Sequence, residues 1–173
     1  MSNGAANVSV WVGEKFVCIK IAGRANFQCS IDFKTLINHL HQQGHSRFVI
    51  DVGECQLMDS TFLGVLAGLG LKFGPQQNGS VAGSLEILNA SDRIFDMLDN
   101  LGIAHLFKLM KGTAPAASEL IPVGKSTAST DRAETAKTCL EAHRLLMELN
   151  PANVAKFKDV TKFLEEDLKK LQQ

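Results

Sequence analysis

Residues 47–73 read RFVIDVGECQLMDSTFLGVLAGLGLKF, and this stretch decides the fold. Its first part, residues 47–52, is a short β-branched, apolar run that predicts a buried strand. Residues 62–73 are apolar on nearly every side of a helix, so we expect that helix to be covered on more than one face. Residues 53–58 would then be a loop between the two. The helix also contains three glycines, Gly64, Gly68 and Gly70. Each glycine costs up to about 1 kcal/mol of helix propensity, and close approach of the helix backbone to a sheet would explain them.

The rest of the chain up to residue 110 alternates predicted strands and helices. Strands are indicated by short β-branched runs, and helices by apolar side chains that recur every three or four residues after a capping serine. The predicted elements are a β-hairpin over 8–12 and 16–21, a turn-like break at 23–26, a helix capped by Ser30 and stopped by Gly44, a strand at 84–88, a helix capped by Ser91, and a short strand or helix at 106–110. This order predicts an α/β domain.

The composition changes after residue 112. Residues 113–130 are rich in Ala, Pro, Ser and Thr, which is typical of a linker. Residues 131–173 have a helical pattern throughout, and the short link at Asn150-Pro151 predicts two helices folded back as a hairpin. The predicted apolar stripes contain Ala136, Leu140, Leu146 and Leu149 on the first helix and Val154, Phe157, Leu164, Leu168 and Leu171 on the second. An amphipathic stripe shows only that something is buried, so its partner is the domain itself, a second copy in a homodimer, or another protein.

The charge and cysteine content exclude several classes of function. Eighteen basic residues balance eighteen acidic ones, so no net field draws the chain to nucleic acid or to a membrane surface. No stretch approaches the roughly 20 apolar residues that span a bilayer, and the first residues lack the pattern of a signal peptide. The four cysteines are widely spaced and form no Cys-x-x-Cys pair, which favours free thiols in a reducing cytoplasm.

Two patterns suggest chemistry but do not support it. Lys125 belongs to a Gly-Lys-Ser-Thr run, but Glu119 stands where a phosphate-binding loop needs its first glycine. His39 and His41 point to different faces of the predicted helix, and Gly44 ends that helix before the next histidine, His45. We therefore expect no metal, no cofactor and no enzymatic activity.

Asp59, Ser60 and Thr61 stand at the start of the buried helix. Ser60 allows two interpretations. As an N-cap, its oxygen would accept a backbone N–H and contribute on the order of 1 kcal/mol. As a phosphoacceptor, it would gain about −1.5 to −2 charges at neutral pH, which the amino terminus of a helix tolerates. No Lys or Arg lies between Arg47 and Lys72, so the new charge would act by repulsion at a docking surface.

Three segments resemble a STAS domain of the anti-sigma factor antagonist type. They are FVIDVGECQLMDSTFLGVL at 48–66, LEILNASDRIF at 85–95 and LGIAHLF at 101–107. The most specific part is the Asp-Ser-Thr-x-Leu-Gly motif after a buried strand, and the resemblance runs from about residue 8 to residue 110. It implies a STAS fold: a four- or five-stranded mixed sheet with helices mainly on one face, here followed by the C-terminal α-helical hairpin.

The resemblance also implies a function. Unphosphorylated antagonists of this family bind an anti-sigma factor that is itself a serine kinase of the histidine-kinase-like ATPase type, and thereby free a sigma factor for transcription. The kinase phosphorylates the antagonist's serine, which weakens the complex, and a serine phosphatase resets it. Carried over to this chain, Ser60 is the phosphoacceptor, and Asp59, Thr61, Phe62 and Leu63 belong to the partner surface.

Two positions depart from the family pattern. Phe62 stands where the family commonly has glycine, and this places a bulky ring beside the acceptor. The loop that often reads Gly-Glu-Leu-Asp in the family is Gly23-Arg24-Ala25-Asn26 here, so Arg24 and Asn26 would alter contacts to a basic partner. The alternative function is a non-switching scaffold or oligomerisation adaptor that binds through the C-terminal helices. The predicted domains are a STAS domain over 1–112, a linker over 113–130 and a helical hairpin over 131–173.

Overall fold

The fold of the chain comes from a computed structural model that describes residues 6–73, 83–124 and 131–172. The strands are β1 (Asn7–Val12), β2 (Val17–Ala25), β3 (Arg47–Asp51), β4 (Cys55–Met58), β5 (Ser84–Leu88), β6 (Lys108–Met110) and β7 (Ile121–Pro122). The helices are α1 (Phe27–Gln42), α2 (Ser60–Phe73), α3 (Asp92–Asn100), α4 (Arg132–Leu149) and α5 (Ala152–Leu171), with short 3₁₀ turns at Ala104–Leu106 and Ala117–Glu119.

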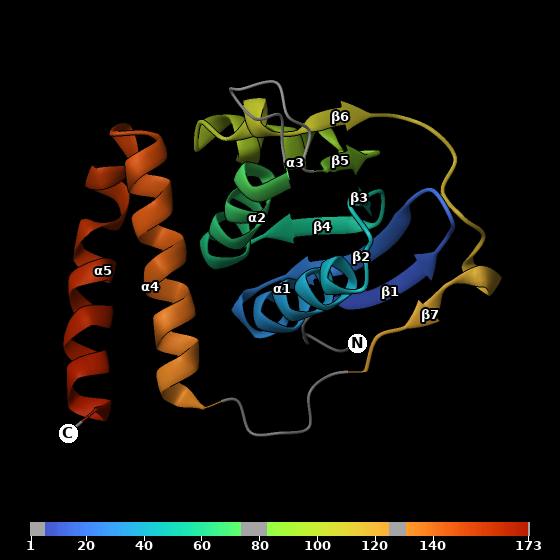
Figure 1. Ribbon diagram of the computed structural model, residues 1–173. Helices are drawn as coiled ribbons and strands as arrows, with labels where there is room; N and C mark the ends of the chain where they lie inside the picture. Colours follow the sequence, from blue (N-terminus) through green and yellow to red (C-terminus); the bar gives the residue numbers. More distant parts are fainter. Residues whose placement is uncertain (1–5, 74–82, 125–130, 173) are drawn as a thin grey trace.

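The strands form one mixed sheet (Figure 1). In the described residues its order is β6-β5-β3-β2-β1-β7, and β4 pairs with the far end of β2. The neighbours β2, β3, β5 and β6 are parallel, whereas β1 is antiparallel to both β2 and β7. The predicted α/β class is confirmed, but in the described residues the sheet has seven strands and not four or five. Strands β4 and β7 lie in segments predicted as a loop and a linker, and both are too short to show as β-branched runs.

Helices α1, α2 and α3 cover one face of this sheet. The strand residues Val17, Ile19 and Ile21 alternate along β2 and are fully buried in the same apolar core as the inner faces of all three helices. Cys18 points to the opposite face, where it joins a small second cluster with Val49 and Leu88. The predicted arrangement of helices mainly on one face is therefore confirmed.

The predicted break at residues 23–26 is wrong, because β2 continues to Ala25. A bulge between Gly23 and Arg24, with Gly23 at a φ of 98°, turns the strand so that it pairs first with β3 and then with β4. The predicted loop at 53–58 is also wrong in part, because its second half is β4. Both errors have one cause: a local sequence pattern does not show that two short segments, here the end of β2 and β4, will pair as parallel strands.

Helix α1 also begins earlier than predicted. Its N-cap is Asn26, whose side-chain oxygen accepts the backbone N–H of Gln28 at 3.0 Å. Ser30 is not the cap: it is fully buried inside the helix and donates its hydroxyl to the Phe27 carbonyl at 2.7 Å. The prediction for α3 is confirmed, since Ser91 accepts the backbone N–H of Ile94 at 3.2 Å.

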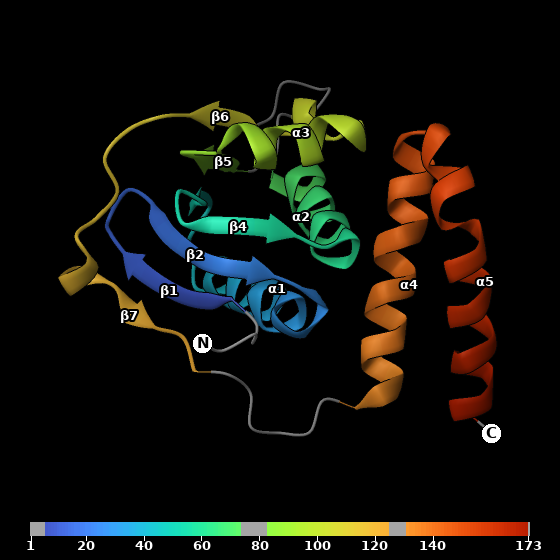
Figure 2. The same cartoon turned by 180° about the vertical axis from the view of Figure 1, so that it is seen from behind.

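The two C-terminal helices form the predicted hairpin at one end of the sheet (Figures 1 and 2). We call α4 and α5 together the C-terminal hairpin. Helix α4 packs against α2 and α1, and α5 packs along the outer side of α4. The segment predicted as a linker carries a 3₁₀ turn and β7 on the edge of β1, and its residues 125–130 lie outside the described residues. None of the helices in the described ranges is long and apolar enough to span a bilayer.

Candidate functional site at the start of α2

The amino terminus of α2 is capped by Asp59. Its carboxylate oxygen Oδ1 accepts the backbone N–H of Phe62 at 2.8 Å, and Oδ2 accepts the backbone N–H of Phe27 at 2.8 Å. One carboxylate therefore satisfies free N–H groups at the starts of two helices, α2 and α1. It also stands next to the positive end of the α2 dipole, where a negative charge is stabilising.

Ser60 is the first residue of α2 and is not its cap. Its hydroxyl Oγ lies 2.8 Å from Nε2 of His143 in α4, a residue 83 positions later in the chain. The other ring nitrogen, Nδ1, lies 2.6 Å from the Cys139 carbonyl oxygen. Because a carbonyl oxygen can only accept, Nδ1 carries a proton, and in the corresponding neutral tautomer Nε2 accepts the hydroxyl hydrogen of Ser60.

His143 is held tightly in this position. Its residue is only 5% exposed, and its ring meets that of Phe157 in α5 edge-on with 5.0 Å between centroids. The hydrogen bond to Ser60 contributes roughly 0.5–1.5 kcal/mol, the net value of a typical intramolecular hydrogen bond. His143 is not among the site residues predicted from the sequence. It falls on the apolar stripe of α4 between Leu140 and Leu146, and a polar side chain at a buried position needs a partner, which is the signal that could have found it.

Thr61 makes the neighbouring contact between α2 and α4. It is buried, and its hydroxyl Oγ1 donates to Sγ of Cys139 at 3.5 Å. Burial raises the pKa of the Cys139 thiol, while the hydrogen bond from Thr61 opposes that shift in part. Ser60 and Thr61 therefore face two residues one helical turn apart on α4.

Phe62 does not lie beside the acceptor on the surface, which corrects the expectation from sequence. It is fully buried, and its ring is 5.0 Å from that of Phe33 in α1. Leu63 is also buried in the core. The physical reason is the helical period: position 62 points back toward the sheet and α1, so the ring fills the space between two helices and leaves the Ser60 hydroxyl on the side that faces α4.

Arg24 and Asn26 lie at the end of β2. The Arg24 side chain is exposed, whereas Asn26 is occupied as the cap of α1. Asn26 is joined to the site indirectly, because Asp59 binds the next backbone N–H, that of Phe27. The structure thus brings Asp59, Ser60 and the start of α1 together, and leaves Arg24 as an exposed charge nearby in the chain.

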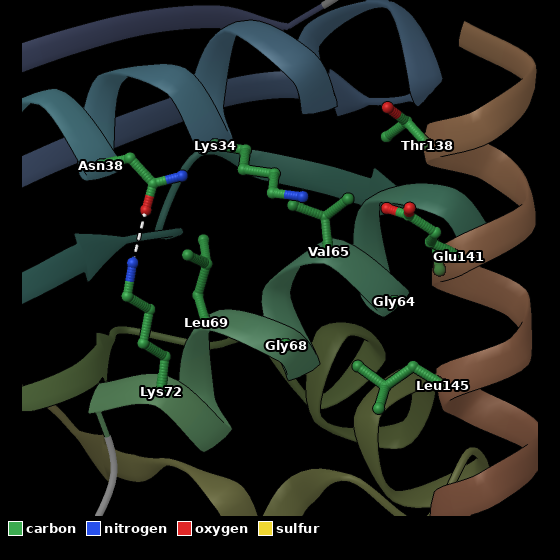
Figure 3. Close-up of a pocket in the computed structure, with 11 residues that line it drawn as sticks. Lys34, Asn38, Gly64, Val65, Gly68, Leu69, Lys72, Thr138, Glu141 and Leu145 are labelled. Carbon is green, nitrogen blue, oxygen red and sulfur yellow. Dashed lines mark hydrogen bonds between the residues drawn. The ribbon is translucent and has the colours of Figure 1, made fainter. Parts of the chain in front are cut away.

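A groove runs beside this site along the seam between α1, α2 and α4 (Figure 3). It has a volume of about 260 Å³. Its floor includes Gly64, Gly68 and Leu145, and Lys34 and Lys72 reach into it from α1 and α2. Lys72 Nζ donates to Asn38 Oδ1 at 2.9 Å. Within the described part of the chain, no group of three or more His, Cys, Asp or Glu side chains is arranged to hold a metal ion.

Chemically, the site presents a serine hydroxyl at a helix amino terminus, hydrogen-bonded to an imidazole nitrogen. An oxygen in this position can accept a phosphoryl group, since the free N–H groups of the first helical turn favour added negative charge. The only described ionisable side chain in direct contact with the Ser60 hydroxyl is His143.

Comparison with solved structures identifies the fold. The anti-sigma factor antagonist SpoIIAA in its unphosphorylated form matches with a TM-score of 0.51 and 19% identity over 63% of this chain and 89% of its own. An anti-sigma factor antagonist from Mycobacterium paratuberculosis matches with a TM-score of 0.53 and 14% identity over 68% of this chain and 92% of its own. The chain has the STAS fold.

The likeness is confined to structure. No protein-family model matches the sequence, and a search of curated proteins finds no match. Both solved structures are covered almost completely, while about a third of this chain stays unmatched. The extra length of this chain is therefore an addition to the fold shared with these antagonists.

Proposed function

We propose that this chain is an anti-sigma factor antagonist whose binding is switched by phosphorylation of Ser60. In its unphosphorylated state it binds an anti-sigma factor that is a serine kinase of the histidine-kinase-like ATPase type, and so controls sigma-factor-dependent transcription. Phosphorylation releases it, and a serine phosphatase restores it. The proposal assumes a cytoplasmic protein, in keeping with four cysteines that are all free thiols.

The observation that carries this proposal is that Asp59, and not Ser60, caps α2. The sequence left Ser60 with two competing roles, a structural cap or a phosphoacceptor. Since the carboxylate of Asp59 meets the N–H of Phe62, the helix does not need the Ser60 oxygen. Modification of the hydroxyl would therefore leave the cap of α2 in place.

The effect of the phosphate follows from its neighbours. In the transfer, Ser60 Oγ forms a bond to the γ-phosphorus of ATP, the bond from that phosphorus to ADP breaks, and the hydroxyl proton passes to a base. The product carries about −1.5 to −2 charges beside the carboxylate of Asp59. Any partner surface pressed against this point would have to bury two like charges, which weakens the complex.

The direct test is phosphorylation of the full chain by a serine kinase of the anti-sigma factor type from the same organism, with ATP, followed by intact mass measurement. We expect one phosphate on the wild-type chain and on Thr61→Ser, and none on Ser60→Ala. In a pull-down with the same kinase, Ser60→Asp should bind at least tenfold more weakly than Ser60→Ala. Phosphate that persists in Ser60→Ala would show that the site is wrong.

One observation favours a second function, that of a scaffold or oligomerisation adaptor. Helix α5 leaves several apolar side chains exposed, and Phe163 is 65% exposed. A second copy of the chain or another protein could cover them. Phe163→Glu should abolish self-association or adaptor binding under this alternative and should leave phosphorylation of Ser60 unchanged under the switch.

A further inference from the structure

We propose that the C-terminal hairpin is an intramolecular competitor that covers Ser60 and the start of α2, so that the hairpin must undock before the kinase can bind. This inference rests on the proposed function and adds a regulatory element to it. It follows from where α4 lies, against Ser60 and Thr61 at the start of α2.

Helix α4 occupies the surface at the start of α2 that the proposed partner would bind. The Ser60 hydroxyl is hydrogen-bonded to His143 of α4, with 2.8 Å between Oγ and Nε2, and the docked helix leaves Ser60 only partly exposed. Thr61, the next residue, contacts Cys139 of the same helix. A kinase must bring a phosphorus atom in line with Ser60 Oγ, and in the docked state that approach is occupied by a buried imidazole.

The surface of α2 allows the backbone of another helix to approach very closely at Gly64. A Cβ atom placed on Gly64 would lie 2.6 Å from both the Cβ and the carbonyl oxygen of Ala142. No side chain larger than hydrogen fits there while α4 is docked. The glycine therefore brings two helix backbones together, and the surface that is exposed when α4 leaves fits a helix with a small side chain opposite Gly64.

The contact between the hairpin and the domain has two features that favour reversible docking. The groove in Figure 3 separates α4 from α1 along part of the seam, with Lys34 and Glu141 at its edge, so the packing there is incomplete. At the other end of the hairpin, Asn153 is fully buried and its Nδ2 donates to the carbonyl oxygens of Leu101 and Leu146 at 3.0 and 2.8 Å. Its Oδ1 has no hydrogen-bond partner among the described residues, and undocking would return this oxygen to water.

The test is a reversible lock in the full chain. Thr61 Oγ1 and Cys139 Sγ are 3.5 Å apart, so Thr61→Cys should form a disulfide with the native Cys139 on oxidation and tie α2 to α4. The probe is the serine kinase that phosphorylates the wild-type chain in the experiment above, with ATP. We expect phosphorylation of the oxidised protein to be at least tenfold slower than that of the same protein after reduction. Thr61→Cys combined with Cys139→Ala should show no dependence on redox state.

A second variant opens the hairpin without touching α2. Ala142→Leu places a larger side chain against Gly64, whereas Ala155→Leu makes the same change at an exposed position of α5. Ala142→Leu should raise the phosphorylation rate several-fold, and Ala155→Leu should match the wild type.

The outcomes separate the two proposals. Equal rates for the oxidised and reduced forms of Thr61→Cys would overturn competition by the hairpin while leaving the phosphorylation switch intact. Absence of a disulfide, together with a wild-type rate for Ala142→Leu, would likewise overturn it. Failure of the kinase to modify Ser60 in the reduced and opened proteins would overturn both.

Discussion

Helices α4 and α5 look alike in sequence but are packed differently. Both are amphipathic, but the apolar face of α4 is buried against the domain, with Leu146 fully buried. Helix α5 lies against α4 and keeps Val154, Phe163 and Leu171 exposed. Within the single chain, Val154 and Leu171 of the predicted α5 stripe are therefore not covered by the domain, and burial by a second copy or another protein stays a prediction.

The difference lies in the small residues. Helix α4 carries Ala136 and Ala142 on its inner face, and the partner helix α2 offers Gly64, so the backbones approach closely. Helix α5 carries larger side chains than α4, and it lies farther from the sheet than α4 does (Figure 1). A stripe of large apolar residues thus shows that a helix has an inner face, whereas small residues show where another helix lies against it.

The largest effect is expected from the loss of a buried side chain in α4, the helix that packs against the domain. Leu146→Ala should lower the free energy of unfolding by about 2–5 kcal/mol, because it deletes fully buried methyl groups and leaves a cavity. Phe163→Ala on α5 should change it by less than about 0.5 kcal/mol. Urea unfolding followed by circular dichroism measures both. A large loss in Phe163→Ala would mean that α5 is covered in solution, for example in a homodimer.

The second-largest effect is expected from Gly64 of α2, which lies against the backbone of α4, in comparison with Gly68 of the same helix. Gly64→Ala should cost about 1–3 kcal/mol, since its methyl group collides with Ala142. Gly68→Ala is the matched control: its Cβ would lie 3.4 Å from Cδ2 of Leu145, and the gain in helix propensity, up to about 1 kcal/mol, should stabilise the protein. Opposite signs in urea unfolding are the expected result, and two losses of equal size would argue against close contact with α4.

The smallest effect concerns the rate at which thiols are labelled in the C-terminal hairpin and in the sheet domain. Cys139 in α4 is half-buried, whereas Cys18, Cys29 and Cys55 in the sheet domain are buried. Burial raises the pKa of the Cys55 thiol to about 11, and the thiolate is the reactive form. Iodoacetamide at pH 8 should therefore label Cys139 first, as located by peptide mass mapping. Ala142→Leu should speed this labelling, since undocking hydrates the thiol and lowers its pKa; unchanged labelling would indicate that the hairpin stays closed.

Much of the fold was predictable, because its strands and helices are locally marked. The helix at residues 62–73 is apolar on all sides because it lies between the sheet, α1 and α4. Ser91 was predicted to cap its helix, and it is the cap. These features follow from residues close together in the chain.

The candidate site was less predictable, because its decisive contacts join distant residues. Asp59 and Ser60 are both good caps, and the choice of Asp59 depends on Phe27, whose N–H group reaches it from α1. The Ser60 partner, His143, comes from the far end of the chain. The glycines of α2 indicated close approach, but Gly64 meets a helix and Gly70 meets the ring of Phe107, not the predicted sheet.

The short strand β7 sets how hard the hairpin is to displace. It pairs with β1, and the Val123 N–H donates to the Val8 carbonyl at 2.8 Å, so the chain is held at the sheet edge just before the hairpin. Residues 124–130 are all that separates this anchor from Asp131, the cap of α4. A segment tethered over so short a distance has an effective concentration on the order of millimolar. Under the proposed competition, this tether would lower the apparent affinity for the kinase in proportion to the small fraction of chains whose hairpin is undocked.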